Sequence, residues 1–131
     1  MPAATAPARS AATVLVIEDH VDTRNLIATL LRRNGFQVIE AEDGVEGLLK
    51  AGASYPDLVI MDLALPEMDG VEIARRIHQM PKLSRTPIFV VSALLTTEIE
   101  ADARAAGCSR LFSKPFDVEA LLSQVRAYVG H

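Results

Sequence analysis

Three apolar tetrapeptides set the architecture expected of this chain: Val14-Leu15-Val16-Ile17, Leu58-Val59-Ile60-Met61 and Ile88-Phe89-Val90-Val91. Each is rich in β-branched side chains and is bounded by polar or turn-forming residues. Uninterrupted apolar character over so short a length is typical of strands that are covered on both faces, as in a parallel sheet. Two weaker segments, residues 36–39 and 110–112, fit strands nearer the edges of that sheet.

Helical patterns occupy the intervals between the predicted strands. Apolar side chains recur there at helical spacing, and aspartates such as Asp43 and Asp117 stand at helix-capping positions. The predicted helices are an apolar stripe over 26–31 closed by Asn34-Gly35, then 43–49, 69–77, 96–106 and 117–129. The segment 96–106 offers mainly alanines and Ile99 as apolar side chains, so we expect this helix to pack weakly, and Gly107 to end it.

Five alternating strand and helix units predict one α/β fold. Parallel strands joined by right-handed helical crossovers form a three-layer, doubly wound (βα)5 sandwich. Helices must cover both faces of an open sheet, so the direction of winding reverses along the chain. The reversal opens a crevice at the carboxyl ends of the strands, and function is expected there.

Composition narrows the class of protein. The 131 residues suit one domain, and 50% apolar with 23% charged residues is ordinary globular composition. The formal net charge of −4 disfavours direct binding to nucleic acid, and a single cysteine, Cys108, excludes an intramolecular disulfide. No apolar run approaches the roughly 20 residues of a membrane span. We expect a flexible N-terminal tail over 1–12, one domain over 13–131, and a cytoplasmic location without membrane contact.

Polar side chains follow the predicted strands at one edge of the sheet. Glu18 and Asp19 follow the first strand, Asp62 the third, Ser92 the fourth and Lys114 the fifth. Carboxylates gathered in this way repel one another, so a cation or a proton must offset their charge. Oxygen ligands alone favour Mg²⁺. A metal ion, an ammonium and a hydroxyl around one carboxylate are suited to hold a phosphoryl group while that carboxylate attacks it.

These residues resemble the response-regulator receiver domain of two-component signalling, the CheY-like superfamily. The resemblance covers about residues 12–130 and rests on five elements at matching spacing. The matching segments are Val16-Ile17-Glu18-Asp19, Met61-Asp62, Pro66 with Glu67-Met68-Asp69-Gly70, Val90-Val91-Ser92-Ala93 and Phe112-Ser113-Lys114-Pro115-Phe116.

The resemblance implies a flavodoxin-like sheet in strand order 2-1-3-4-5 and a phosphoacceptor at Asp62. It also implies that Asp19, Asp62 and the backbone carbonyl of Ala64 bind Mg²⁺, or Mn²⁺ in its place, with Glu18 acting through water. A signalling domain of this kind is a phosphoacceptor rather than an enzyme. Its phosphodonor is a histidine kinase or a histidine phosphotransfer protein.

The phosphate-binding and switch residues follow from the same resemblance. Lys114, Ser92 and the backbone N–H of Ala93 would bind the phosphoryl group, and Phe112 would be the aromatic switch. The Lys114-Pro115 peptide bond would be cis. The switched surface, formed by the fourth helix, fifth strand and fifth helix, would bind a downstream protein or a second copy of the chain.

Some residues depart from the family pattern or allow a simpler interpretation. Serine stands at position 92 where many relatives have threonine, and phenylalanine at 112 where tyrosine is commoner. Phe112 is also interpretable as an ordinary core residue. We interpret His20 as a loop residue outside the pattern, and Cys108 as a small buried filler rather than a redox sensor.

Three other functions fit parts of this pattern, and missing residues disfavour two of them. The chain would fit a receiver-fold interaction module that phosphorylation does not control. A small phosphatase with an aspartyl nucleophile typically needs a second aspartate two residues further on, where this chain has Ala64. A nucleotide-binding domain needs a glycine-rich loop after the first strand, where Glu18-Asp19 stand instead. Neither the cognate kinase nor the output follows from the sequence, and the chain would suit a stand-alone regulator or one domain of a larger protein.

Overall fold

A parallel five-stranded sheet in the order β2-β1-β3-β4-β5 forms the centre of the computed structural model, which describes residues 11–130. The strands are β1 (Thr13–Ile17), β2 (Gln37–Ala41), β3 (Leu58–Met61), β4 (Ile88–Ser92) and β5 (Arg110–Ser113). The helices are α1 (Val21–Arg33), α2 (Gly44–Ser54), α3 (Gly70–Gln79), α4 (Thr97–Ala105) and α5 (Val118–Val129), with a short 3₁₀ helix η2 (Pro81–Leu83). The predicted doubly wound fold and strand order are confirmed.

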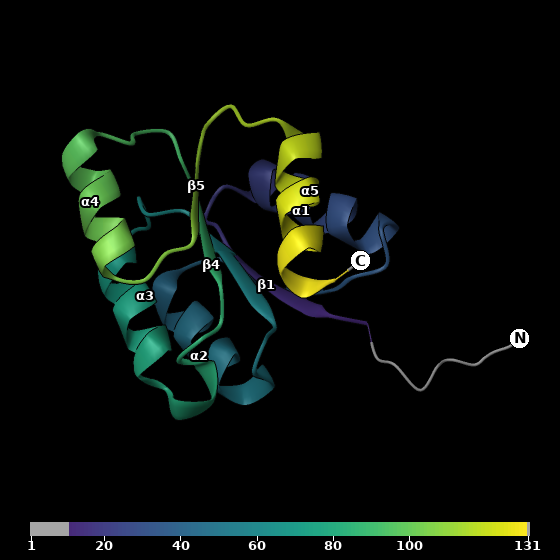
Figure 1. Ribbon diagram of the computed structural model, residues 1–131, viewed down its shortest axis with the longest axis horizontal. Helices are drawn as coiled ribbons and strands as arrows, with labels where there is room; N and C mark the ends of the chain where they lie inside the picture. The colour runs from purple at the N-terminus through teal and green to yellow at the C-terminus, as the bar shows by residue number, and fades with distance from the viewer. Residues whose placement is uncertain (1–10, 131) are drawn as a thin grey trace, which may run out of the picture.

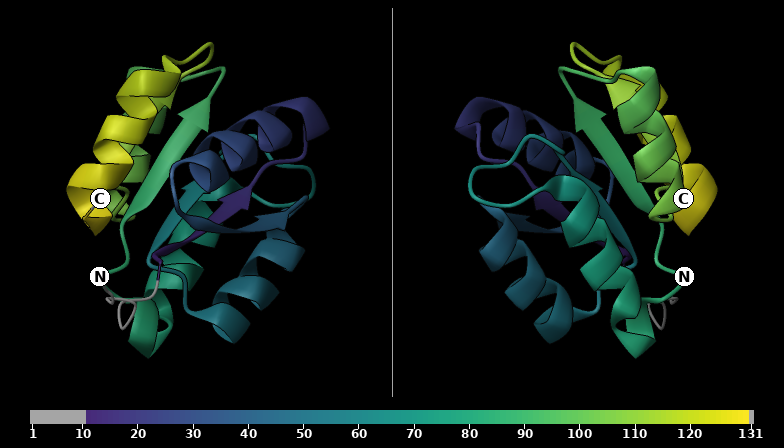
Figure 2. Two further views of the ribbon diagram at one scale, coloured as in Figure 1. Left: turned by 90° about the vertical axis from the view of Figure 1, so that its right-hand side faces the viewer. Right: turned by 90° about the vertical axis from the view of Figure 1, so that its left-hand side faces the viewer.

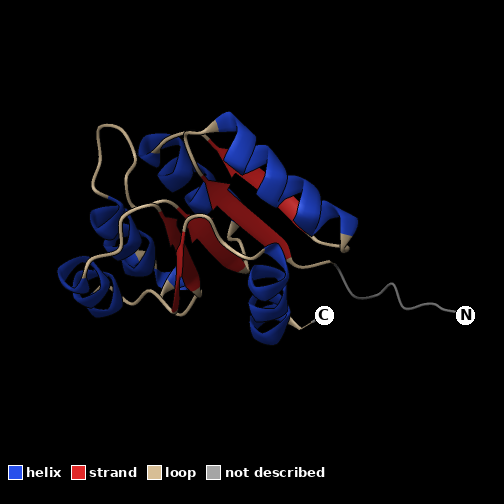
Figure 3. Cartoon of the chain, turned by 90° about the horizontal axis from the view of Figure 1, so that it is seen from above, coloured by secondary structure: helices blue, strands red, loops and turns tan. Residues whose placement is uncertain are grey.

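The helices cover both faces of the sheet, as Figure 1 shows and the view from above in Figure 3 repeats. Side chains of α1 and α5 pack on one face, and those of α2, α3 and α4 pack on the other. Successive strand residues point to opposite faces, so Leu15 and Ile17 join one core while Val14 and Val16 join the other. Each central strand therefore needs an apolar residue at every position.

The first crossover ends in a Schellman motif that decides where β2 begins. After α1, the N–H of Gly35 donates to the carbonyl of Arg32, and the N–H of Phe36 donates to the carbonyl of Leu31. The N–H of Phe36 is thus used by the helix end, and the strand starts at Gln37. The predicted strand over 36–39 was placed one residue early and ended two residues short.

Side-chain caps start four of the helices, as their sequences favour. The side chains of Asp43, Asp69, Thr96 and Asp117 each accept a hydrogen bond from a backbone N–H in the first turn of α2, α3, α4 and α5, respectively. At α2, Glu46 accepts a hydrogen bond from the backbone N–H of Glu42 in return. Each cap lies in the loop that follows a strand, and so shapes the edge of the sheet where the polar residues gather.

Helix α4 has the thinnest attachment to the core. Ala103 is its only buried residue, whereas α3 buries five residues, among them Ile73 and Ile77. Figure 2 shows α4 and α5 near the same end of the sheet. The weak packing expected of α4 is therefore present, and little apolar contact resists its movement.

Residues 1–10 of the tail predicted over 1–12 lie outside the described residues, and the carbonyl of Ala12 accepts a hydrogen bond from the N–H of Gln37. Within residues 11–130, the helices are all too short or too polar to cross a bilayer.

Two matched glycines allow a test of how α4 is held. Gly35 and Gly107 both follow a helix in the left-handed region, at φ 91° and φ 95°. A Cβ at Gly35 would meet open space, whereas one at Gly107 would lie 2.6 Å from Nδ1 of His78. We expect Gly35→Ala to cost about 1 kcal/mol of unfolding free energy from backbone strain. Gly107→Ala should cost about 1–2 kcal/mol more because of the clash.

Urea unfolding of both variants measures this difference. Adding His78→Ala to Gly107→Ala should recover most of the extra loss, once the cost of His78→Ala alone is subtracted. Equal costs for the two glycine variants would show that His78 does not constrain the end of α4.

The pH dependence of stability tests whether the thiol of Cys108 is buried in the folded state. Burial raises the pKa of its thiol from 9.0 to about 11, so the unfolded chain ionises at a lower pH than the folded one. The unfolded state therefore binds fewer protons between these values, and stability falls as pH rises from about 9 to 11. We expect the wild type to lose about 2 kcal/mol more than Cys108→Ala between pH 8.5 and 10.5.

Urea titrations of both proteins at the two pH values check this expectation. The difference between the proteins removes the effects of lysine and tyrosine titration, which they share. Parallel losses in the two proteins would mean that the thiol is solvated in the folded state. The burial of Cys108 agrees with its interpretation as an apolar filler.

Candidate functional site

The polar residues after β1 and β3 lie side by side where the winding of the sheet reverses. Ile17 and Met61 are register partners at the ends of these strands, so Glu18 and Asp62 occupy equivalent positions just beyond them. The backbone N–H of Asp62 donates to the carbonyl of Ile17. Strand β2 lies on the other side of β1, and this is the switch point at which doubly wound folds bind ligands.

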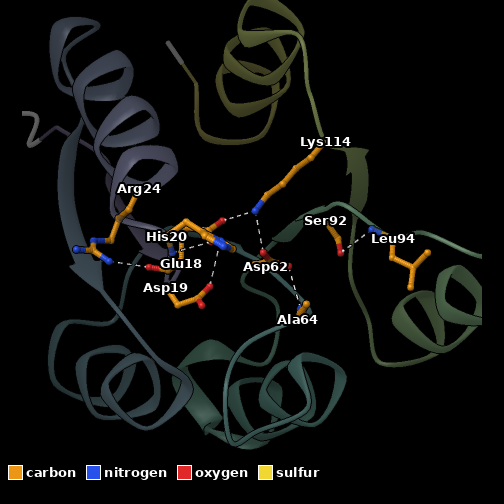
Figure 4. A network of polar contacts seen from close by, with 9 residues as sticks. All are labelled: Glu18, Asp19, His20, Arg24, Asp62, Ala64, Ser92, Leu94 and Lys114. Carbon is orange, nitrogen blue, oxygen red and sulfur yellow. Dashed lines mark hydrogen bonds and ion pairs between the residues drawn. The ribbon is translucent and has the colours of Figure 1, made fainter.

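Lys114 joins the two buried acids from the loop after β5 (Figure 4). Its Nζ lies 2.8 Å from Oδ2 of Asp62 and 2.8 Å from Oε1 of Glu18. Glu18 and Asp62 are only 2% and 3% exposed, so their charges are poorly hydrated. Burial works to lower the pKa of Lys114, but hydrogen bonds and charge from Asp62 and Glu18 outweigh it and raise that pKa above its ordinary value.

The other carboxylate oxygen of Asp62 is held by the backbone. The N–H of Ala64 donates to Oδ1 of Asp62 over 2.9 Å, in a turn that begins at the end of β3. Both oxygens of Asp62 therefore have a donor at a defined position, which fixes the orientation of the carboxylate. The Lys114-Pro115 peptide bond that precedes the last helix is cis.

Asp19 is the partly exposed member of the acidic group. Its Oδ1 is buried, and no hydrogen bond to it is found among the residues that the structure describes. A buried carboxylate oxygen without a donor is costly, and it indicates a place for a ligand of positive charge. The ammonium of Lys114 pairs with Glu18 and Asp62 but not with Asp19, so the group of three carboxylates carries excess negative charge.

His20 belongs to this cluster, although it lies outside the family pattern. Its Nδ1 lies 3.1 Å from Oε2 of Glu18 and 3.4 Å from Oδ1 of Asp19. The backbone N–H of His20 also donates to Oε2 of Glu18. One potential ligand atom from each of Glu18, Asp19, His20 and Asp62 lies within 4.8 Å of the other three. The turn after β1 therefore brings an imidazole to the acids.

Arg24 is a second residue that the sequence pattern did not single out. From α1, it donates to the backbone carbonyl of Glu18 over 2.8 Å and forms an ion pair with Glu40 of β2. Its side chain is only 14% exposed. The arginine thereby ties the loop after β1 to the neighbouring strand. The signal available in the sequence was its place one turn into the helix that follows the acidic pair.

The predicted phosphate-binding and switch residues lie at the ends of β4 and β5. Ser92 is buried at the end of β4, and its Oγ accepts a hydrogen bond from the N–H of Leu94 over 3.4 Å. Its carbonyl accepts a hydrogen bond from the N–H of Lys114. Ala93 follows Ser92 directly, at the exposed start of the next loop. The half-buried ring of Phe112 packs 5.8 Å from the ring of Phe89.

The fold and this edge of polar residues define a class of protein, and comparison with known proteins agrees. The family model of the response regulator receiver domain matches residues 14–126, and the chain belongs to this family. Its class of function is that of the phosphoacceptor signalling domains of two-component systems, rather than that of a classical enzyme.

Particular relatives cover nearly the whole domain. The polar-differentiation response regulator DivK of Brucella ovis is 30% identical over 117 residues, which are 89% of this chain and 95% of DivK. Chemotaxis protein CheY4 of Vibrio cholerae is 28% identical with a TM-score of 0.86, over 91% of this chain and 99% of that one. The receiver domain of the sensor histidine kinase PA1611 of Pseudomonas aeruginosa is 25% identical with a TM-score of 0.84, over 93% and 100% of the chains, and contains a magnesium ion in its active-site cleft.

Proposed function

We propose that Asp62 accepts a phosphoryl group from a phosphohistidine on a histidine kinase or a histidine phosphotransfer protein. The observation that supports this most is the placement of its buried carboxylate, 2.8 Å from the ammonium of Lys114 and beside the acids after β1. A carboxylate oxygen attacks phosphorus in line, the phosphorus–nitrogen bond of the donor breaks, and an acyl phosphate forms. The donor imidazole leaves with the electron pair of the broken bond.

The residues present fit a divalent cation. Asp19 provides a buried oxygen without a hydrogen-bond donor, and the cluster carries excess negative charge. Asp19, Asp62 and the backbone carbonyl of Ala64 would hold the ion, with Glu18 acting through water. Mg²⁺ suits these oxygen ligands, and Mn²⁺ would also be accepted. When bound, the ion supplies positive charge that offsets the charge on the transferring phosphoryl oxygens.

Other residues respond to the new charge on Asp62. Lys114, the hydroxyl of Ser92 and the N–H of Ala93 would bind the phosphoryl oxygens. Because the N–H of Lys114 already donates to the carbonyl of Ser92, the loops after β4 and β5 would move together. Phe112 would then turn inward, and phosphorylation would shift an existing equilibrium between two states of the α4-β5-α5 surface.

This switched surface would bind a downstream protein or a second copy of the chain. Direct binding to nucleic acid is not part of the proposal, because the formal charge of the chain is −4. We place the reaction in the cytoplasm, together with the kinase partner.

Phosphorylation by a small donor tests this function. Incubation with phosphoramidate and Mg²⁺ should add one phosphoryl group to the intact protein, as measured by mass spectrometry, and EDTA should prevent the addition. The product should be labile to hydroxylamine, as an acyl phosphate is. A protein that takes up no phosphoryl group under these conditions would instead be an interaction module that phosphorylation does not control.

A further inference from the structure

We propose that His20 supplies a nitrogen ligand to the cation at this site, and that the site therefore prefers Mn²⁺ and later first-row ions over Mg²⁺ more strongly than its oxygen ligands alone would. The inference rests on the metal site of the proposed function and adds a residue to it. It begins from the four potential ligand atoms of Glu18, Asp19, His20 and Asp62, which lie within 4.8 Å of one another.

The backbone directs the imidazole toward the acids. His20 stands at the N-cap of α1, but its side chain makes no capping hydrogen bond. The N–H of His20 donates to the Glu18 carboxylate instead, and Nδ1 faces both Glu18 and Asp19, as Figure 4 shows. The atom nearest to Nδ1 on Asp19 is Oδ1, the buried oxygen without a hydrogen-bond donor. The ring nitrogen and this oxygen thus face the same space.

The ring can also adjust to an ion, which would replace the contact of Nδ1 with Oε2 of Glu18. The His20 side chain is 68% exposed, so a small rotation displaces solvent rather than packed core atoms. The acids cannot move as readily, because Glu18 and Asp62 are buried and share the ammonium of Lys114. The His20 nitrogen is therefore an adjustable donor beside the fixed oxygens of Glu18 and Asp62.

A nitrogen donor changes the preference among metals. Mg²⁺ binds oxygen and keeps much of its water, whereas imidazole favours transition ions, with affinity rising from Mn²⁺ through Co²⁺ and Ni²⁺. An octahedral site made of oxygen ligands only also shows part of this order of metal affinities. The contribution of His20 is thus the change in the ratio of Mg²⁺ to Mn²⁺ dissociation constants when its nitrogen is removed.

His20→Phe keeps a ring at this position and removes the nitrogen. We expect the Mn²⁺ dissociation constant to rise about tenfold and the Mg²⁺ dissociation constant to change by less than about twofold. The electron paramagnetic resonance signal of free Mn²⁺ measures the first of these constants. Pulsed electron paramagnetic resonance of the wild type with bound Mn²⁺ should show coupling to a directly bound imidazole nitrogen. The coupling should disappear in His20→Phe, while the unfolding midpoint stays within a few degrees.

Asp19→Asn separates failure of this inference from failure of the proposed site. Loss of both Mg²⁺ and Mn²⁺ binding in Asp19→Asn, together with nitrogen coupling in the wild type, would support the inference. Strong Mn²⁺ binding in the wild type without nitrogen coupling would overturn the role of His20 but not the metal site. The same preference between Mg²⁺ and Mn²⁺ in His20→Phe and the wild type would do so too. Absence of binding by either ion would overturn both the inference and the metal site on which it rests.

Discussion

Asp62→Asn is expected to lower phosphoryl uptake by a factor of at least about 10³, to the background of the assay. The amide keeps the shape of the side chain but has no carboxylate oxygen with which to attack phosphorus. The N–H of Ala64 and the ammonium of Lys114 hold different oxygens of Asp62, so the single amide oxygen still accepts a hydrogen bond from one of them and keeps the side chain in place. Loss of labelling would therefore report loss of the nucleophile, measured by intact mass after incubation with phosphoramidate and Mg²⁺.

Asp57→Asn is the matched control for this substitution. Asp57 precedes β3 and Asp62 follows it, so the two aspartates flank the same strand at opposite edges of the sheet. Asp57 accepts a hydrogen bond from the N–H of Thr13, far from the acidic cluster. The control should label like the wild type. Equal labelling of Asp62→Asn and the wild type would show that another residue is the acceptor.

Lys114→Met is expected to lower the free energy of unfolding by about 3 kcal/mol in metal-free buffer at pH 7. Methionine fills a similar volume but leaves Glu18 and Asp62 buried beside each other without a counter-charge. Saturating Mg²⁺ should reduce the loss, because the ion replaces part of the missing positive charge. Urea unfolding with EDTA and with Mg²⁺ measures both effects.

The pH dependence of this loss follows from the raised pKa of Lys114. The contribution of the ammonium is complete below the pKa of an unfolded lysine, about 10.4, and is lost as pH rises through the higher pKa of the folded state. The difference between the wild type and Lys114→Met should therefore be constant from pH 7 to 9 and shrink only above about pH 10. Lys82→Met, which removes an exposed lysine near the ring of Tyr55, should cost less than about 1 kcal/mol. A similar loss in both variants would mean that the Lys114 pairs contribute no special stability.

The proximity of Glu18 and Asp62 was predictable from the sequence, because it depends only on where the two strands end. Asp62 directly follows one buried apolar run and Glu18 another, and parallel register then places both at one edge. Lys114 follows a weaker strand, but the same argument applies to it. Sequence patterns identify residues at this edge well, since a fully buried parallel strand leaves a clear apolar signal.

The contacts within the loops were not predictable in the same way. His20 lies against Glu18 because of a turn in which a backbone N–H binds a side chain, and no periodicity encodes such a turn. Arg24 reaches the carbonyl of Glu18 only because α1 packs across the sheet. The start of β2 likewise depends on a backbone hydrogen bond from Phe36 to the end of α1. Each of these features is fixed by hydrogen bonds between neighbouring elements rather than by composition.

The small side chain of Ala103 determines how easily helix α4 can move. Since Ala103 is the one residue that α4 buries, rotating the helix exposes little of the apolar surface of the helix itself to water. Its backbone amides should exchange with solvent sooner than those of α3, whose isoleucines anchor it. Movement of α4 would therefore disturb only the edge of the hydrophobic layer to which Ala103 belongs, and would leave the layer beneath α1 and α5 in place.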